Sequence, residues 1–124
     1  MSHPMSVEII NQYGTPSVRV GIEQHSVLLA ADDVDRLIEH LAAVRASMRP
    51  EVPAVPSRTH QYLMEVDPCW HSEKHPLYEG AVLLFRHAGF GWTGFALPTP
   101  SLVRLKDALS AHLDALHEAP GLPN

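Results

Sequence analysis

Two amphipathic helices are indicated by the spacing of apolar residues along the chain. The first follows Asp32, which can cap a helix N-terminus, and is expected to end near Met48. The second is capped by Thr99, with Pro100 at the first helical position. The apolar stripes comprise Val34, Leu37, Ile38, Leu41 and Val44 in the first helix and Leu102, Leu105, Leu109, Leu113 and Leu116 in the second. Each stripe needs a second layer to cover it.

Alternating apolar and polar residues predict the strands of that second layer. In the first half, Val7–Tyr13 and Val18–Ile22 flank a turn-forming Gly-Thr-Pro-Ser segment and predict a hairpin. In the second half, Gln61–Val66 alternates as a single strand. Gly80–His87 and Trp92–Leu97 flank a glycine-bearing turn and predict a second hairpin.

The fold class that follows is α+β. We expect one two-layer domain, 1–124, with an antiparallel four- or five-stranded sheet and both helices on one face, in the order ββα-β-ββα. An offset of 68 residues aligns Leu29 with Leu97 and Arg36 with Arg104, as in an internal duplication, although two helices of one period also align by chance. Three prolines in 49–58 predict an extended connector between the halves, and 1–5 and 118–124 are expected to be loose tails.

Composition narrows the functional classes. Apolar residues make up 45% and charged residues 19%, which is typical of a globular protein. No apolar run is long enough to predict a membrane-spanning helix, so we do not expect a membrane as a partner. Nine Lys and Arg against fourteen Asp and Glu give a net charge of −5, the wrong sign for a nucleic-acid partner. The N-terminal residues do not resemble a secretory signal, and the single cysteine, Cys69, cannot form an internal disulfide. We therefore expect a cytoplasmic protein.

The residues from Cys69 to His75 form the strongest candidate for a metal site. Cys69, His71 and His75 are ligand types that zinc accepts, and a loop could fold them around one ion with a fourth position open to water. Lys74 lies inside the same segment and opposes a cation, and no second ligand pair follows at a recognised spacing. A solvated loop without metal is the competing interpretation, and no other cofactor is expected.

Other catalytic patterns are absent from the sequence. Residues 89–94 have the glycine spacing of a dinucleotide-binding turn, but a strand-like run and two prolines separate them from the next helix. No nucleophile-elbow motif is present, and Cys69 is the only serious candidate nucleophile. We therefore assign no catalytic or cofactor-binding residue, and a non-enzyme is favoured over an enzyme.

Large apolar residues outside the predicted core suggest a different kind of site. Trp70, Leu63 and Phe90 are candidates for contact with a protein partner. The functional hypothesis is a non-catalytic binding or assembly module that forms a homodimer through an edge strand or an uncovered sheet face. Two alternatives stay open: a metal-binding protein or metal-dependent enzyme using the Cys69–His75 segment, and a small acidic inhibitor of another macromolecule, as bacteria and phages use against toxins or nucleases.

Overall fold

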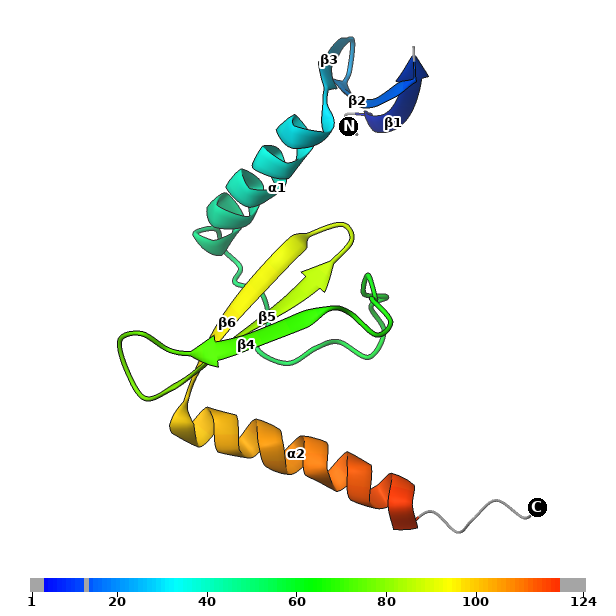
Figure 1. The fold of residues 1–124 in the computed structure, drawn as a ribbon. Helices are drawn as coiled ribbons and strands as arrows, with labels where there is room; N and C mark the ends of the chain where they lie inside the picture. The colour runs from blue at the N-terminus through cyan, green and yellow to red at the C-terminus, as the bar shows by residue number, and fades with distance from the viewer. Residues whose placement is uncertain (1–3, 13, 119–124) are drawn as a thin grey trace, which may run out of the picture. The chain divides into compact units, whose positions relative to one another are not determined.

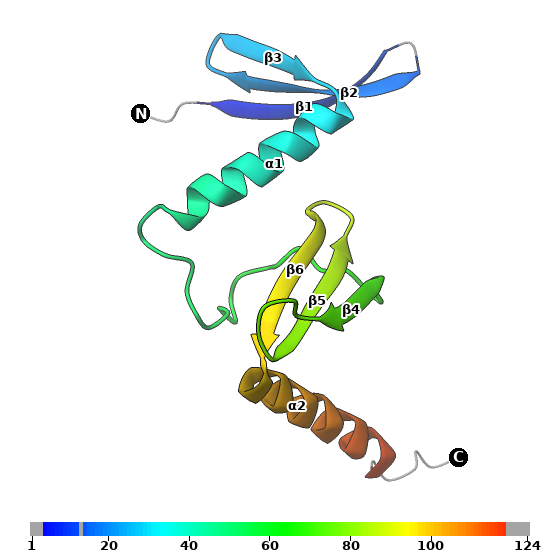
Figure 2. The same cartoon turned by 60° about the vertical axis from the view of Figure 1, so that its left-hand side comes forward.

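The chain divides into two compact units, Met1–Leu63 and Met64–Asn124. The computed structural model describes residues 4–12 and 14–118. Each unit contains one three-stranded antiparallel sheet followed by one helix (Figures 1 and 2). The same order of elements, βββα, therefore occurs twice along the chain.

Unit 1 is a meander of three strands followed by a helix. Its elements are β1 (Met5–Gln12), β2 (Thr15–Ile22), β3 (His25–Leu29) and α1 (Ala31–Ala46), and β2 is the central strand. Gly14 allows the chain to reverse between β1 and β2, because its φ of 76° is a conformation that costs glycine little. Residues on opposite strands of an antiparallel pair share a face, so the register separates the side chains of this sheet into two sets.

One face of the unit 1 sheet is almost entirely apolar. Val7 pairs with Val20, which pairs with Val27, so these three side chains lie side by side on that face. The whole apolar set is Met5, Val7, Ile9, Val18, Val20, Ile22, Val27 and Leu29. Glu8 and Arg19 pair on the other face, with 4.0 Å between the carboxylate and guanidinium groups. The predicted two-faced pattern of Val18–Ile22 is confirmed.

Unit 2 repeats this order of elements with strands of the same lengths in the reverse order and a longer helix. Its elements are β4 (Trp70–Lys74), β5 (Gly80–His87), β6 (Gly91–Pro98) and α2 (Thr99–Glu118), and β5 is the central strand. The register places Trp70, Leu83, Phe85, Phe95 and Leu97 on the face toward α2 and His71, Glu73, Val82, Leu84, Trp92 and Ala96 on the opposite face. The first residues of α1 and α2 are 68 positions apart, which is the offset at which the sequence aligns with itself.

The α+β class is confirmed, but the predicted strand arrangement was wrong. Instead of one four- or five-stranded sheet in the order ββα-β-ββα, the chain forms two three-stranded sheets in the order βββα-βββα. The strand expected at Gln61–Val66 is irregular, whereas Trp70–Lys74, expected to be a loop, is β4. β3 was not predicted, because the turn before it, at Glu23 (φ 58°), contains no glycine or proline.

The remaining boundaries differ by smaller amounts. α1 begins after Ala30 instead of after Asp32, and the Asp33 carboxylate accepts a hydrogen bond from the Ala30 amide (3.1 Å). Asp33 therefore satisfies one amide at the N-terminus of α1 from within the helix. α2 begins at Thr99, β5 has the predicted bounds, and β6 extends one residue beyond the prediction at each end. The expected single domain and loose tails stay predictions, and Tyr13, residues 1–3 and residues 119–124 lie outside the described part.

We expect Gly80→Ala to destabilise unit 2 by roughly 1–3 kcal/mol. Gly80 begins β5 with a φ of 149°, and a Cβ there would lie 2.1 Å from the carbonyl oxygen of Leu97. Gly89→Ala is the matched control, because its Cβ would contact only the His87 ring, at 3.4 Å. Urea unfolding measures both effects, and equal stability of the two variants would contradict the proposed clash.

Candidate functional site

An open apolar groove lies between α2 and the sheet of unit 2. The groove has a volume of about 570 Å³. Its lining residues are Trp70, Leu83 and Phe85 from the sheet and Leu102, Leu105, Lys106, Leu109, Ser110 and Leu113 from the helix. Every sheet residue in this set lies on the face toward α2, and the helix residues recur at the spacing of one helix face. We call this cavity the α2 groove.

The α2 groove is open because the helix separates from the sheet along its length. Leu102 and Leu105, in the first two turns, are half-buried. Further along the same stripe, the exposed fraction is 54% for Leu109, 57% for Leu113 and 74% for Leu116. The predicted apolar stripe is therefore formed, but only its N-terminal part contacts the sheet. The C-terminal part of the stripe is a surface without a covering layer.

Unit 1 also has an apolar surface without a covering layer. Its apolar sheet face includes Met5, Val7 and Ile9, all of which are exposed, and α1 leaves Leu41 exposed as well. No hydrophobic side chain in the described part of the chain is fully buried. Both units therefore present the apolar residues that would form a core in a compact domain of this size.

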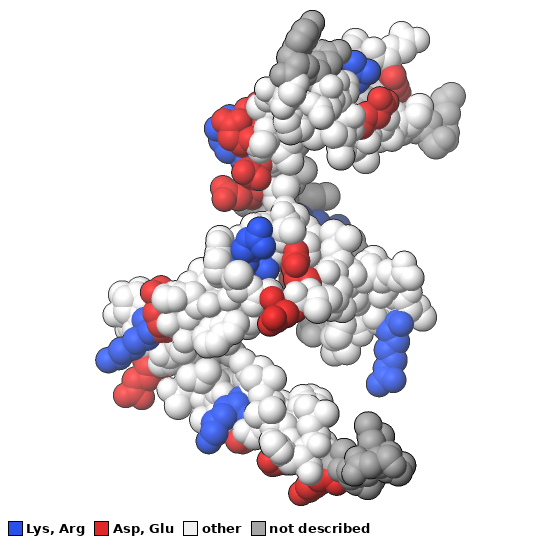
Figure 3. Space-filling model, turned by 45° about the vertical axis from the view of Figure 1, so that its right-hand side comes forward, with Lys and Arg blue, Asp and Glu red and all other residues white. Residues whose placement is uncertain are grey.

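Charged side chains are sparse on one face of the molecule. On the face seen in Figure 3, acidic and basic residues form small separate groups, with wide areas that contain neither. At the start of α1, Arg36 binds Asp32 (3.6 Å) and Asp33. On that face no broad basic area is present, so its charge distribution does not resemble that of a surface that binds phosphate backbones.

The three candidate metal ligands lie along an extended segment. The ladder of backbone hydrogen bonds continues on both sides of β4, from the Arg86 amide to the Cys69 carbonyl (2.9 Å) and from the His75 amide to the Gly80 carbonyl (3.3 Å). Cys69, His71 and His75 share one face, but six extended residues span roughly 20 Å. In this conformation the three ligands do not converge. Within residues 4–12 and 14–118, no three His, Cys, Asp or Glu side chains form a group that could hold a metal ion.

Two histidines instead hold turns at the two ends of β5. The amides of Leu77 and Tyr78 donate to Nδ1 of His75, at 2.9 and 3.3 Å. At the other end, the amides of Gly89 and Phe90 donate to Nδ1 of His87, at 2.9 and 3.1 Å. Each Nδ1 accepts these bonds through its lone pair, so it carries no hydrogen, and the ring hydrogen is on Nε2.

The same turns also pair each histidine ring with an aromatic ring three residues later. The rings of His75 and Tyr78 stack with centroids 3.6 Å apart, and those of His87 and Phe90 lie 4.5 Å apart. The sequence signal is a histidine followed by an aromatic residue at the third position, immediately after one strand and at the end of another. This repeated signal was missed in the sequence, where His75 was considered only as a ligand.

The candidate partner-binding residues are placed in three different settings. Trp70 is exposed at the edge of the α2 groove, where it pairs with Phe85. Phe90 is in the β5–β6 turn and packs against His87. Leu63 is exposed at the end of unit 1, outside its helix and strands. Trp70 is the candidate that belongs to a formed cavity.

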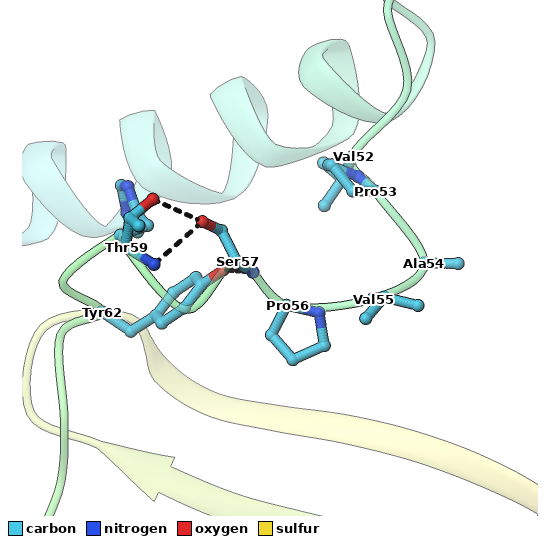
Figure 4. Close-up of a pocket in the computed structure, with 9 residues that line it drawn as sticks. Val52, Pro53, Ala54, Val55, Pro56, Ser57, Thr59 and Tyr62 are labelled. Atoms are coloured by element: carbon cyan, nitrogen blue, oxygen red, sulfur yellow. Dashed lines mark hydrogen bonds between the residues drawn. The ribbon is translucent and has the colours of Figure 1, made fainter.

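The Pro-rich connector folds back on itself instead of running fully extended. The Tyr62 hydroxyl accepts a hydrogen bond from the Ser57 amide (2.8 Å), and the hydroxyl groups of Ser57 and Thr59 lie 3.0 Å apart (Figure 4). The loop surrounds a cavity of about 650 Å³ lined by Val52, Pro53, Ala54, Val55, Pro56, Ser57, Thr59, His60 and Tyr62. Its only titratable side chains are His60 and Tyr62, whose rings contact each other edge to face. This cavity has no convergent set of catalytic groups.

No protein-family model matches the chain, and no curated protein or solved structure is significantly similar to it. Among the described residues, no helix is long and apolar enough to cross a membrane. The functional argument therefore depends on the geometry of the two units, in which open apolar surfaces are the most prominent feature.

We expect His75→Ala to destabilise unit 2 by roughly 1–2 kcal/mol, because two backbone amides lose their acceptor. His75→Asn should recover part of this loss, since an Asn side chain can accept a hydrogen bond from the amide two residues later. His71→Ala is the control, because the exposed side chain of His71 accepts no backbone amide of a turn and lies 3.7 Å from the Glu73 carboxylate. Urea unfolding and amide hydrogen exchange at Leu77 measure the effect, and an unprotected Leu77 amide in the native protein would contradict it.

Proposed function

We propose that this chain is a non-catalytic assembly module that binds a second copy of itself through the uncovered apolar surfaces of its two units. The supporting observation is the absence of any fully buried hydrophobic side chain among the described residues, although both helices have an apolar stripe and both sheets have an apolar face. A monomer would leave these surfaces in water at a cost of about 25 cal/mol per Å². Association with a partner removes that cost.

The amount of exposed surface agrees with this proposal. The chain exposes 11292 Å². Two separate compact domains, each of half the chain's mass, would together expose about 8,000 Å². The excess is about 3,000 Å² per chain, whereas obligate homodimers bury roughly 2,000–5,000 Å² counted over both chains, or roughly 1,000–2,500 Å² per chain. Pairing with a second copy would therefore cover most, but not all, of this excess.

The α2 groove supports a partner that is a protein surface. It is lined by aliphatic and aromatic side chains, with Lys106 and Ser110 as its only polar residues. Interface centres have this composition, with large aromatic residues and few charges. Trp70 at the edge of the groove is the residue type most often found to dominate binding energies.

We expect Leu109→Asp to weaken self-association at least about tenfold, because it places a charge in a surface that becomes buried. Val103→Asp is the matched control on the same helix. Val103 is 48% exposed, close to the 54% of Leu109, but it does not line the groove. Sedimentation equilibrium of the untagged protein gives the dissociation constants. Equal effects of the two substitutions would contradict a role for the groove.

The metal-binding alternative is tested by measuring the zinc content of the same untagged protein. Because Cys69, His71 and His75 are spread along an extended segment, we expect less than one zinc ion per chain, with no change in Cys69→Ser or His71→Ala. Stoichiometric zinc that disappears in these variants would support a metal centre and contradict the non-catalytic proposal. The acidic-inhibitor alternative has no specific observation in its favour beyond the net charge of −5.

A further inference from the structure

The four edge strands of the two sheets differ in how well they are protected against pairing. Proteins protect open edges with charged residues, prolines, bulges or short strands. β4 contains Glu73 and Lys74, β1 contains Glu8, and β3 has only five residues. β6 has eight residues and contains no Lys, Arg, Asp or Glu, and its one proline, Pro98, is the last residue. β6 is the longest edge strand without a charge.

The hydrogen-bond pattern shows which backbone groups face the open side of β6. The Arg86 amide and the Gly80 carbonyl both form hydrogen bonds with β4. The backbone amides and carbonyls of the even-numbered β5 residues therefore face β4, and those of the odd-numbered residues face β6. By the register, Thr93, Phe95 and Leu97 then bond to β5. The amides and carbonyls of Trp92, Gly94 and Ala96 consequently point away from the sheet.

The side chains at these outward positions allow another backbone to come close. Gly94 has no side chain and Ala96 has only a methyl group, so a neighbouring strand at the usual spacing of about 4.8 Å meets little obstruction. Trp92 and Phe95 are both about half exposed, on opposite faces of β6. A strand added here would cover part of both aromatic side chains.

We propose that β6 pairs antiparallel with β6 of a second copy, joining two three-stranded sheets into one six-stranded sheet. A two-fold pairing brings each side chain close to side chains of the same strand, and in a chain of net charge −5 an uncharged strand is where two copies meet without repulsion. The pairing also makes the α2-facing apolar face continuous from one copy to the next. The inference rests on the proposed function, because it adds a backbone contact to the apolar surfaces through which the two copies are proposed to associate.

The test replaces an outward-facing residue by proline on each edge of the unit 2 sheet. Ala96→Pro removes an amide that points away from β5, so the native β5–β6 pairing keeps its hydrogen bonds. Ser72→Pro is the matched control, because Ser72 occupies an outward-facing position on β4, the opposite edge. Circular dichroism and thermal unfolding establish that both variants are folded.

We expect Ala96→Pro to raise the dimer dissociation constant about thirtyfold, because two symmetry-related hydrogen bonds are lost, and Ser72→Pro to leave it unchanged. Ala96→Lys, which keeps the amide but adds two like charges at the contact, should also weaken the dimer. Amide exchange at Trp92, Gly94 and Ala96 should be slow in the wild-type dimer and faster on dilution.

Two results would overturn the inference, and they differ in what they mean for the proposed function. A wild-type dimer that is equally stable in Ala96→Pro and Ala96→Lys, with fast exchange at Gly94, would show that the copies meet elsewhere and would leave the assembly function intact. A wild-type chain that is monomeric at every concentration would exclude both the β6 contact and the assembly function.

Discussion

The rest of this structure depends on one constraint: the apolar surface of each unit is larger than the layer that covers it. Each three-stranded sheet has a largely apolar face, and the single helix of its unit leaves part of the apolar surface exposed. In unit 2 the helix contacts the sheet through its first turns, and Leu109 and Leu113 remain exposed. In unit 1 the β1 side of the apolar face is exposed. Neighbouring strands of each sheet are hydrogen-bonded to one another, but the hydrophobic burial that normally stabilises a domain is incomplete.

This imbalance explains why local interactions are important in both units. The turns at the ends of β5 are held by His75 and His87, and the start of α1 by Asp33. Glu65 adds a longer connection, since its carboxylate accepts a hydrogen bond from the Ala88 amide (2.6 Å) in the β5–β6 turn. These contacts fix the local backbone without contributing an apolar core. The larger part of the available stabilisation lies in the surfaces that a partner would cover.

The sequence was sufficient for elements whose apolar pattern is strong, and insufficient for the two five-residue edge strands, β3 and β4. Both helices, β5 and β6 could be predicted within one or two residues because their apolar residues recur at a clear period. β4, with the sequence Trp-His-Ser-Glu-Lys, shows no such period, because an edge strand is held mainly by backbone hydrogen bonds to β5. For the same reason His71 and His75 were interpreted as loop ligands. Backbone pairing leaves little trace in side-chain composition, so the position of β4 required the structure.

The sequence by itself determined the α+β class, the two amphipathic helices and the repeat offset of 68 residues, because these depend on local periodicity. It also indicated that the leucines of α2 form an apolar stripe that requires a covering layer and that Trp70 is a candidate for contact with a partner. Only the tertiary structure decided that the strands form two separate sheets, that Nδ1 of His75 accepts backbone amides, and that the open edge of β6 presents Gly94 and Ala96. Strand pairing and hydrogen-bond direction depend on which backbone segments meet in space, and side-chain periodicity does not encode that choice.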